Sequence, residues 1–295
     1  MDENRISISA LPFHYTYGLS VLHCAIEARA PIVLTELSLV DKAFWPLAEK
    51  HMITDFSGVP FMFEVLRRIK LNDTVLHNLK CITQAGGRLD TRHTEYFARL
   101  CRENEIDYYT MYGQTEASPR ISYVPPERAL DKLGSVGIPL TIGKFYTDAE
   151  DTVSEGELIY EGPNVCMGHA SNRQDLTKAD SNAGVLKTGD IAKIDTEGYA
   201  TIVGRTKRYV KIFGLSVNLD DLEIKLKKQA FDTAVIGTDN CIVILTSRHD
   251  IQDIRDYIYS VVNFPTRVIK IINVNEIKHT KVGKVDYQEM SKEYL

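Results

Sequence analysis

The stretch from Lys80 to Glu116, KCITQAGGRLDTRHTEYFARLCRENEIDYYTMYGQTE, decides the fold class. Its apolar run at 80–84 indicates a strand, the periodic apolar residues of 90–104 indicate a helix, and 107–111 indicates a second strand. A strand, a helix and a strand at this spacing form a crossover unit, in which the two strands run parallel. The stretch therefore predicts an α/β domain with a mainly parallel sheet.

The same alternation extends toward the N-terminus. Expected strands lie at 5–10, 31–35 and 53–56, and expected helices at 18–29, 41–51 and 59–70. Between about 134 and 204 the helical periodicity disappears. Short strands at 157–160, 191–194 and 199–203, with a DTEG turn at 195–198, predict a small antiparallel β region there.

A third pattern follows Gly204. It predicts strands at 209–213, 234–237, 241–246 and 267–274, helices at 219–229 and 251–262, and then a lysine-rich tail. This α+β segment has fewer than a hundred residues, which is enough for a domain that folds alone. We therefore expect residues 1–206 to form part of a large domain and residues 207–295 to form a small, mobile one.

Charge and composition exclude several classes of protein. The 295 residues include 35 Lys and Arg against 40 Asp and Glu, a formal charge of −5, while 44% of the residues are hydrophobic and 25% charged. These proportions are those of a globular protein that can bury a core. The slight negative charge lacks the overall positive field of a non-specific nucleic-acid binder, so no nucleic-acid partner is expected.

The cysteines and the N-terminus indicate a reducing compartment. The five cysteines are widely spaced, without a C-x-x-C pair or the Cys/His spacing of a zinc site. Residues 6–26 carry no Asp, Glu, Lys or Arg, but Pro12, Gly18, two histidines and several hydroxyls interrupt the stretch. Such a stretch is a poor membrane span, and the acidic start MDENRISIS lacks a signal-peptide pattern. We expect a cytoplasmic protein with no membrane span.

Two glycine turns follow predicted strands of the large domain. Tyr112-Gly113-Gln114-Thr115-Glu116 presents an aromatic face, hydroxyls and a carboxylate, which suit base stacking, phosphate contact and Mg²⁺ binding. Gly86-Gly87 permits close backbone approach or a positive φ. Taken singly, a polar loop and an ordinary turn explain these residues at least as well.

Two basic segments lie further along the chain. The KTGD at 187–190 and the cations of 205–211 suit the ribose hydroxyls and phosphates of a nucleotide, although on charge alone a solvated charged face is the better explanation. In the tail, Lys284 follows Gly283, and a lysine on a mobile loop can reach a reacting phosphate or carboxylate. An exposed basic loop is the alternative.

In their order, these segments resemble the adenylate-forming family, which includes acyl-CoA synthetases, aryl-CoA ligases, luciferases and the adenylation domains of peptide synthetases. The matching segments are LPFHYTYGL at 11–19, QAGG at 84–87, YGQTE at 112–116, KTGD at 187–190, GRTKRYVKIFGLSVNLDDLE at 204–223 and TKVGKVD at 280–286. They extend over essentially the whole chain, and together they are highly specific, although no single one is.

The resemblance implies roles for the residues of the large domain. Tyr112 would stack on adenine, and Gly86, Gly87 and Gly113 would line the nucleotide pocket. Thr115 would bind the nucleotide phosphate and Glu116 would help to hold Mg²⁺.

The resemblance also implies roles near and beyond the domain boundary. Asp190 would bind the ribose hydroxyls and Arg205 would reinforce that end. Lys207 would be the hinge, Gly214 would lie on the loop that reaches the active site after rotation, and Lys284 would bridge the carboxylate and the α-phosphate during adenylation. The implied cofactors are ATP or AMP and Mg²⁺.

Two departures from the family pattern stand out. Many acyl-CoA ligases have a histidine three residues before the glycine of the first motif, where this chain has Tyr15 and where His14 is its neighbour. The family's phosphate loop, of the type SGTTGxPK, has no counterpart here, because the ten residues before Leu11 contain no glycine. Three alternatives explain this second departure. The chain is a fragment, or one chain of a split enzyme with a separate N-terminal polypeptide, or a degenerate remnant.

The resemblance implies an ATP-dependent ligase that activates a carboxylic acid as acyl-AMP. It would pass the acyl group to a thiol, either that of CoA or the phosphopantetheine of an acyl- or peptidyl-carrier protein. The alternative is a protein that binds a nucleotide or an acyl group without turnover, or that completes the active site of another chain.

Overall fold

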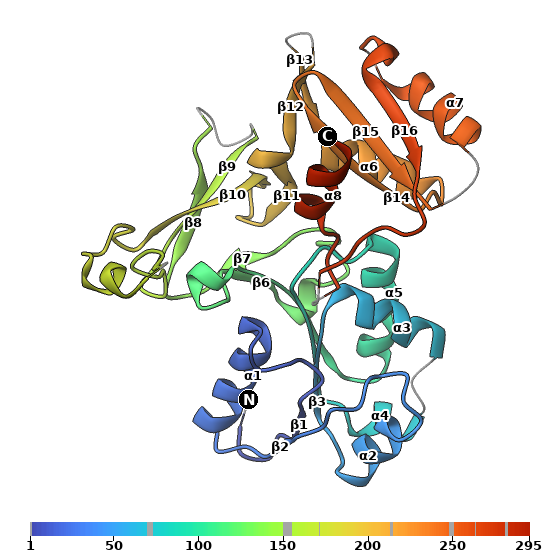
Figure 1. Ribbon diagram of the computed structural model, residues 1–295. Coiled ribbons are helices and arrows are strands. Elements are labelled where there is room, and N and C mark those ends of the chain that lie inside the picture. Colours follow the sequence, from blue (N-terminus) through green and yellow to red (C-terminus); the bar gives the residue numbers. More distant parts are fainter. Residues whose placement is uncertain are drawn as a thin grey trace. The chain divides into compact units, whose positions relative to one another are not determined.

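The computed structural model describes residues 2–69, 73–149, 155–170, 172–212, 215–247, 251–262, 264–280 and 283–295 (Figure 1). The chain divides into two compact units. Unit 1 comprises Met1–Ser154, Leu158–Thr188 and Lys193–Thr201, and unit 2 comprises Glu155–Glu157, Gly189–Ala192 and Ile202–Leu295.

A seven-stranded sheet organises unit 1. Its strands lie in the order β2-β1-β3-β4-β5-β6-β7. Their bounds are β1 Ser7–Ile8, β2 Ile32–Val33, β3 Asp55–Gly58, β4 Cys81–Gln84, β5 Asp107–Tyr112, β6 Ser122–Val124 and β7 Ile138–Pro139. Neighbours from β2 to β5 pair parallel, and β6 and β7 add antiparallel. The predicted mainly parallel sheet is confirmed.

Crossover helices join the parallel strands. They are α1 Thr16–Glu27, α2 Phe44–Lys50, α3 Pro60–Ile69, α4 Asp73–Asn78 and α5 Thr91–Glu103. Pro60 opens α3, where its missing N–H costs nothing, and the Asp90 side chain caps α5 by accepting from the Arg92 amide. The sequence analysis missed α4, because six residues are too few to show a helical period.

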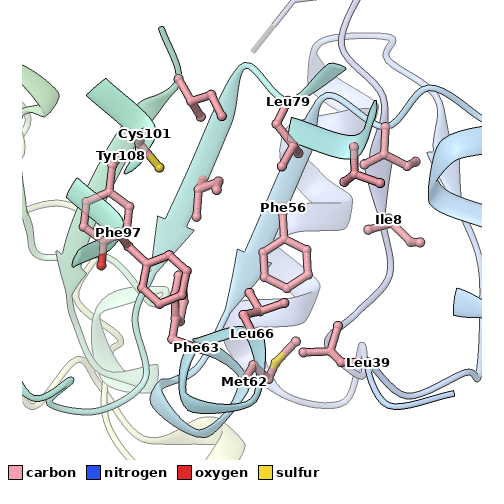
Figure 2. Packing of buried hydrophobic residues seen from close by; sticks show 14 of the residues in the cluster. Ile8, Leu39, Phe56, Met62, Phe63, Leu66, Leu79, Phe97, Cys101 and Tyr108 are labelled. Atoms are coloured by element: carbon pink, nitrogen blue, oxygen red, sulfur yellow. The ribbon is translucent and has the colours of Figure 1, made fainter. Parts of the chain in front are cut away.

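Aliphatic and aromatic side chains together fill the core between this sheet and its helices (Figure 2). Phe63 is fully buried and meets Phe97 edge to face, with ring centroids 5.0 Å apart. Phe56 of β3 and Tyr108 of β5 meet the same ring at 6.4 and 6.2 Å. Such edge-to-face contacts fix helix α3 against strands β3 and β5, which flank β4.

A four-stranded sheet follows, in the order β11-β10-β9-β8. Its strands are β8 Lys144–Thr147, β9 Gly156–Glu161, β10 Val185–Ile194 and β11 Ala200–Arg205. The predicted turn between β10 and β11 is confirmed, since the Gly198 amide donates to the Asp195 carbonyl at 2.9 Å. Strand β10 begins earlier than predicted, so KTGD lies inside a strand. The reason is that Leu186, Thr188, Asp190 and Ala192 alternate toward the buried side.

Unit 2 contains a small α+β core. The hairpin β12 Tyr209–Ile212 and β13 Leu215–Asn218 precedes α6 Leu219–Lys228, and a three-stranded sheet combines β14 Thr233–Thr238, β15 Cys241–Thr246 and β16 Ile269–Asn273. Helix α7 Ile251–Val261 and helix α8 Tyr287–Tyr294 complete it. Val235 and Ile236 of β14 belong to two different apolar clusters, as alternation along a strand requires. The tail holds α8, which packs on β14 and which the sequence analysis did not predict.

None of the helices in the described part of the chain combines the length and the apolar character that a membrane-crossing helix needs.

Candidate active site

The glycine turn after β4 lies against the first motif of the chain. Gly86 has a φ of +81°, and a Cβ at this position would lie 2.4 Å from the Tyr15 hydroxyl. The side chain of buried Gln84 holds the turn, since its Nε2 donates to the Gly87 carbonyl at 2.9 Å. Glycine is therefore required at position 86 both by its conformation and by the phenol beside it.

The glycine turn after β5 is tighter still. A Cβ on Gly113 would lie 1.7 Å from the Pro119 carbonyl oxygen, so only glycine fits. Tyr112 packs half-buried against the cluster of Ala117, Ile121, Tyr160 and Leu186. Gln114 donates to the Thr188 carbonyl at 2.7 Å, which links this turn to strand β10. These contacts fix the loop that bears Thr115 and Glu116.

Thr115 and Glu116 lie in a short 3₁₀ turn, Thr115–Ala117. The Thr115 hydroxyl is 3.0 Å from the hydroxyl of Thr16, the first residue of α1. The Glu116 carbonyl accepts from the Cys166 amide at 2.8 Å, and its carboxylate, one third exposed, lies 3.9 Å from His169 Nε2. A partly exposed carboxylate on a fixed backbone is thus available to a cation.

The donor set around Glu116 fits Mg²⁺ better than a transition metal. Among the described residues no three His, Cys, Asp or Glu side chains gather into a metal-binding cluster. Mg²⁺ commonly takes only one or two carboxylates and completes its coordination with substrate phosphates and water. Glu116 would be such a carboxylate ligand.

In unit 2, Asp190 and Arg205 form an ion pair. Asp190 is 4% exposed, and its Oδ1 accepts from Arg205 Nε at 3.0 Å. The Gly189 amide donates to Glu157 at 2.9 Å, and the Thr206 hydroxyl donates to the Gly189 carbonyl at 3.0 Å. Asp190 is therefore held at a fixed place beside a guanidinium that is itself more than half exposed.

The amino group of Lys284 interacts electrostatically with both members of this ion pair. Partial burial of the amino group, and then repulsion from Arg205, lower the pKa of Lys284, while Asp190 opposes the change. The residue as a whole remains exposed, so the lowering reflects crowding around the amine and not an enclosed site. Hydrogen bonds from the Thr280 amide to the Lys284 carbonyl, 2.7 Å, and from the Lys284 amide to the Thr280 hydroxyl, 3.2 Å, fix the backbone there.

The structure thus gathers the sequence-derived candidates into two groups. Gly86, Gly87 and residues 112–116 follow β4 and β5, whose parallel pairing brings their carboxyl ends to one edge of the sheet of unit 1. Asp190, Arg205 and Lys284 lie together in unit 2. Lys207 falls in the 3₁₀ turn Thr206–Arg208 that follows β11, and Gly214 lies outside the described residues.

Sequence reasoning gave no role to Thr16 or Gln114, whose side chains hold the 112–116 loop. The several hydroxyl side chains of LPFHYTYGL could have indicated a polar contact of this segment. Only the fold shows that the partner of Thr16 is Thr115, which lies 99 positions later in the sequence.

A family comparison decides the relationship. The model of the AMP-binding enzyme family matches residues 1–169, more than half of the chain. The chain belongs to the AMP-binding enzyme family. The glycine turns after β4 and β5 lie within the matched region.

Relatives in this family are CoA ligases. The 2-succinylbenzoate–CoA ligase of Bacillus subtilis is 30% identical over 200 residues, which cover 66% of this chain and 40% of that enzyme. The 4-coumarate–CoA ligase-like protein 6 of Arabidopsis thaliana is 25% identical, over 98% of this chain and 54% of that protein. The chain therefore spans about half the length of the curated relatives it matches.

Solved structures share the fold. An o-succinylbenzoate CoA synthetase from Bacillus subtilis, in complex with its acyl-adenylate intermediate, matches 98% of this chain and 61% of its own, with a TM-score of 0.79 and 20% identity. Fatty acyl-adenylate ligases from E. coli and L. pneumophila match with a TM-score of 0.76 at 18% identity, over 100% of this chain and 62% of theirs. At this identity the likeness concerns the fold.

Proposed function

We propose that this AMP-binding enzyme chain acts in the ATP-dependent activation of a carboxylic acid to an acyl-adenylate, followed by transfer of the acyl group to the thiol of CoA. The cluster of Lys284, Arg205 and Asp190 carries the proposal. An anionic phosphate bound beside Lys284 and Arg205 would be attracted by both cations, and the fixed Asp190 lies beside them. The names of the relatives, which pair an acid with CoA, support the choice of reaction.

The chemistry would proceed in two displacements. A substrate carboxylate oxygen attacks the α-phosphorus of ATP, an O–P bond forms, and pyrophosphate leaves. The CoA sulfur then attacks the acyl carbon, its proton passes to solvent, and AMP leaves. Lys284 would stabilise the negative charge that develops in the first displacement, where an additional positive charge has the greatest effect on the rate.

Nucleotide binding would fall to the remaining candidates. Tyr112 would stack on adenine beside Gly86, Gly87 and Gly113, and the Thr115 hydroxyl would donate to phosphate. Asp190 would accept from the ribose hydroxyls, with Arg205 beside it. Mg²⁺ held by Glu116 would neutralise phosphate charge. Lys207 is proposed as the hinge, and rotation of residues 207–295 would withdraw Lys284 and admit the thiol.

The test is carboxylate-dependent exchange of pyrophosphate into ATP. It is run with a panel of aromatic and aliphatic acids, on the chain alone and with a polypeptide that supplies the part of the relatives not spanned here. We expect Lys284→Ala to lower exchange by about 100-fold or more, as loss of a preorganised charge at a reacting centre does. The matched control is Lys278→Ala, which removes an exposed lysine of the same segment and should keep exchange near wild type.

A second measurement separates the two half-reactions. Lys284→Ala should still form the thioester from supplied acyl-AMP, and equal loss of both steps would contradict the assigned role. Nucleotide binding without exchange under any condition would favour the alternative of a non-catalytic binder. A phosphopantetheine carrier in place of CoA would appear as acyl transfer to the carrier alone.

A further inference from the structure

A buried carboxylate in unit 2 collects four donors that no role above explains. Glu223 of α6 is 4% exposed. It accepts from the Val235 amide at 3.0 Å, from Arg208 at 3.1 Å, and from the Tyr287 hydroxyl and Lys227 at 2.7 Å each. A buried charge with this many partners is fully satisfied and holds its donors in one geometry.

Arg208 is the second centre of the same cluster. It is 8% exposed and donates to Asp220 at 2.8 Å and to the Val235 carbonyl, and its guanidinium carbon lies over the Tyr287 ring, 3.8 Å from the centroid. Burial, and then the Glu223 charge, raise the pKa of Tyr287, so its phenol keeps the proton that it donates. A cation over an aromatic face is strongest in such a desolvated place.

Arg208 and Tyr287 each lie three residues after a candidate site residue. Arg208 stands three residues after Arg205, at the end of the 3₁₀ turn that also holds Lys207. Tyr287 stands three residues after Lys284 and is the first residue of α8. The contact between Arg208 and Tyr287 therefore joins the segment that follows Arg205 in the chain to the segment that follows Lys284.

We propose that Tyr287, held by Arg208 and Glu223, positions Lys284 beside Asp190 and Arg205. Among the described residues, hydrogen bonds with Thr280 hold the backbone of Lys284. A buried ion pair is weak evidence of a stabilising role, because apolar side chains can often replace the whole pair at little cost. Tyr287 and Arg208 are positioning residues, and their role in catalysis rests on the function proposed for Lys284.

The test follows the reactivity of Lys284 itself. The intact protein is labelled with an amine-specific reagent from pH 7 to pH 10.5, and the labelling midpoint of each lysine is read by mass spectrometry. Tyr287→Leu should shift the midpoint of Lys284 to higher pH, toward that of an isolated lysine, because the amine moves away from Arg205 and into solvent. Tyr287→Phe keeps the ring over Arg208 but loses the hydrogen bond to Glu223, so it should shift the midpoint less than Tyr287→Leu does. Arg208→Lys loses the planar guanidinium and should also shift the midpoint.

Controls make the result decisive. Ile254→Val trims a fully buried side chain in α7 of the same unit, and it should leave Lys284 labelling unchanged while lowering stability. Circular dichroism and thermal melting confirm that each variant is folded. An unchanged midpoint in Tyr287→Leu would overturn the proposal, as would an equal shift in Ile254→Val. An equal shift in Tyr287→Phe would overturn the role of the Arg208 stack.

This readout is independent of turnover. If pyrophosphate exchange is absent, the proposed function fails while the labelling still reports on positioning. Where exchange is present, Tyr287→Leu should lower exchange and spare thioester formation from supplied acyl-AMP. Equal losses in both half-reactions would indicate a merely structural effect and would overturn the positioning role.

Discussion

Gly113 occupies a place where one added methyl group does not fit. Its Cβ would lie 1.7 Å from a backbone oxygen of Pro119, which cannot move without moving the loop. We expect Gly113→Ala to lower the free energy of unfolding by about 3 kcal/mol or more, in the upper range for single substitutions. Urea denaturation measures the loss.

The control is Gly198→Ala. Gly198 has a φ of +85° but open space around it, so alanine meets only the strain of a left-handed backbone, about 1–2 kcal/mol. If the two variants lost the same stability, the close approach at Gly113 would not be the cause.

Buried thiols and phenols make the protein sensitive to alkali. Burial raises the pKa of Cys101 from 9.0 to about 12 and that of Tyr17 from 10.0 to about 12. The unfolded chain therefore releases these protons at lower pH than the folded chain. The free energy of unfolding should fall from about pH 9 upward, first through the thiols and then through the phenol.

Denaturation curves at pH 7 to 11 test this dependence. Cys101→Ala should show a shallower fall between pH 9 and pH 10, whereas Tyr17→Phe should keep the wild-type slope up to pH 10 and show a shallower fall above it. Wild-type slopes in both variants would contradict the assignment.

Among the elements, the β10–β11 hairpin is fixed at its tip by a charge cluster within unit 1. Lys132 donates to Asp195 at 2.7 Å and to Glu197 at 2.8 Å, and it lies 4.5 Å from the centre of the Tyr199 ring. Arg128 donates to Glu197 at 2.6 Å. Several charges that share one turn can hold it where a single exposed pair would not.

We expect Lys132→Met to loosen this turn. The Tyr199 amide, which donates to the Asp195 side chain at 2.9 Å, should exchange its hydrogen roughly two- to fivefold faster, and 0.5 M salt should produce part of the same effect in wild type. Lys144→Met, which removes a lysine paired with Glu161 on strands β8 and β9 of the same sheet, away from the turn, is the control. Unchanged exchange at Tyr199 would mean that backbone hydrogen bonds alone hold the turn.

At the scale of the whole molecule, unit 2 carries its own cores. The two apolar clusters around the β14-β15-β16 sheet draw all their residues from positions 210–294. A polypeptide of residues 207–295 should therefore fold by itself and melt cooperatively, as a domain with its own core does. A dispersed amide NMR spectrum would show this, and a random-coil spectrum would contradict it.

Most of the fold follows from periodicity, and the exceptions have physical reasons. Strands β3, β4, β5 and β15 lie close to the predicted positions because each is a short apolar run between turn residues. Helix α8 was missed because eight residues with three apolar positions resemble a charged tail. The strand predicted at 191–194 begins after KTGD, whereas β10 includes it, because Thr188 and Asp190 find hydrogen-bond partners on the buried side.

The sequence by itself determined the parallel α/β sheet, the change to an α+β pattern after Gly204, and the order of the motifs along the chain. These depend on local periods of two and 3.6 residues and on turn chemistry, which neighbouring residues set. Only the tertiary structure decided the buried cluster that includes Tyr287, the first residue of α8. Arg208, Glu223 and Tyr287 lie 15 and 64 positions apart in the chain, and the contact among them exists because folding removes water from all three at once.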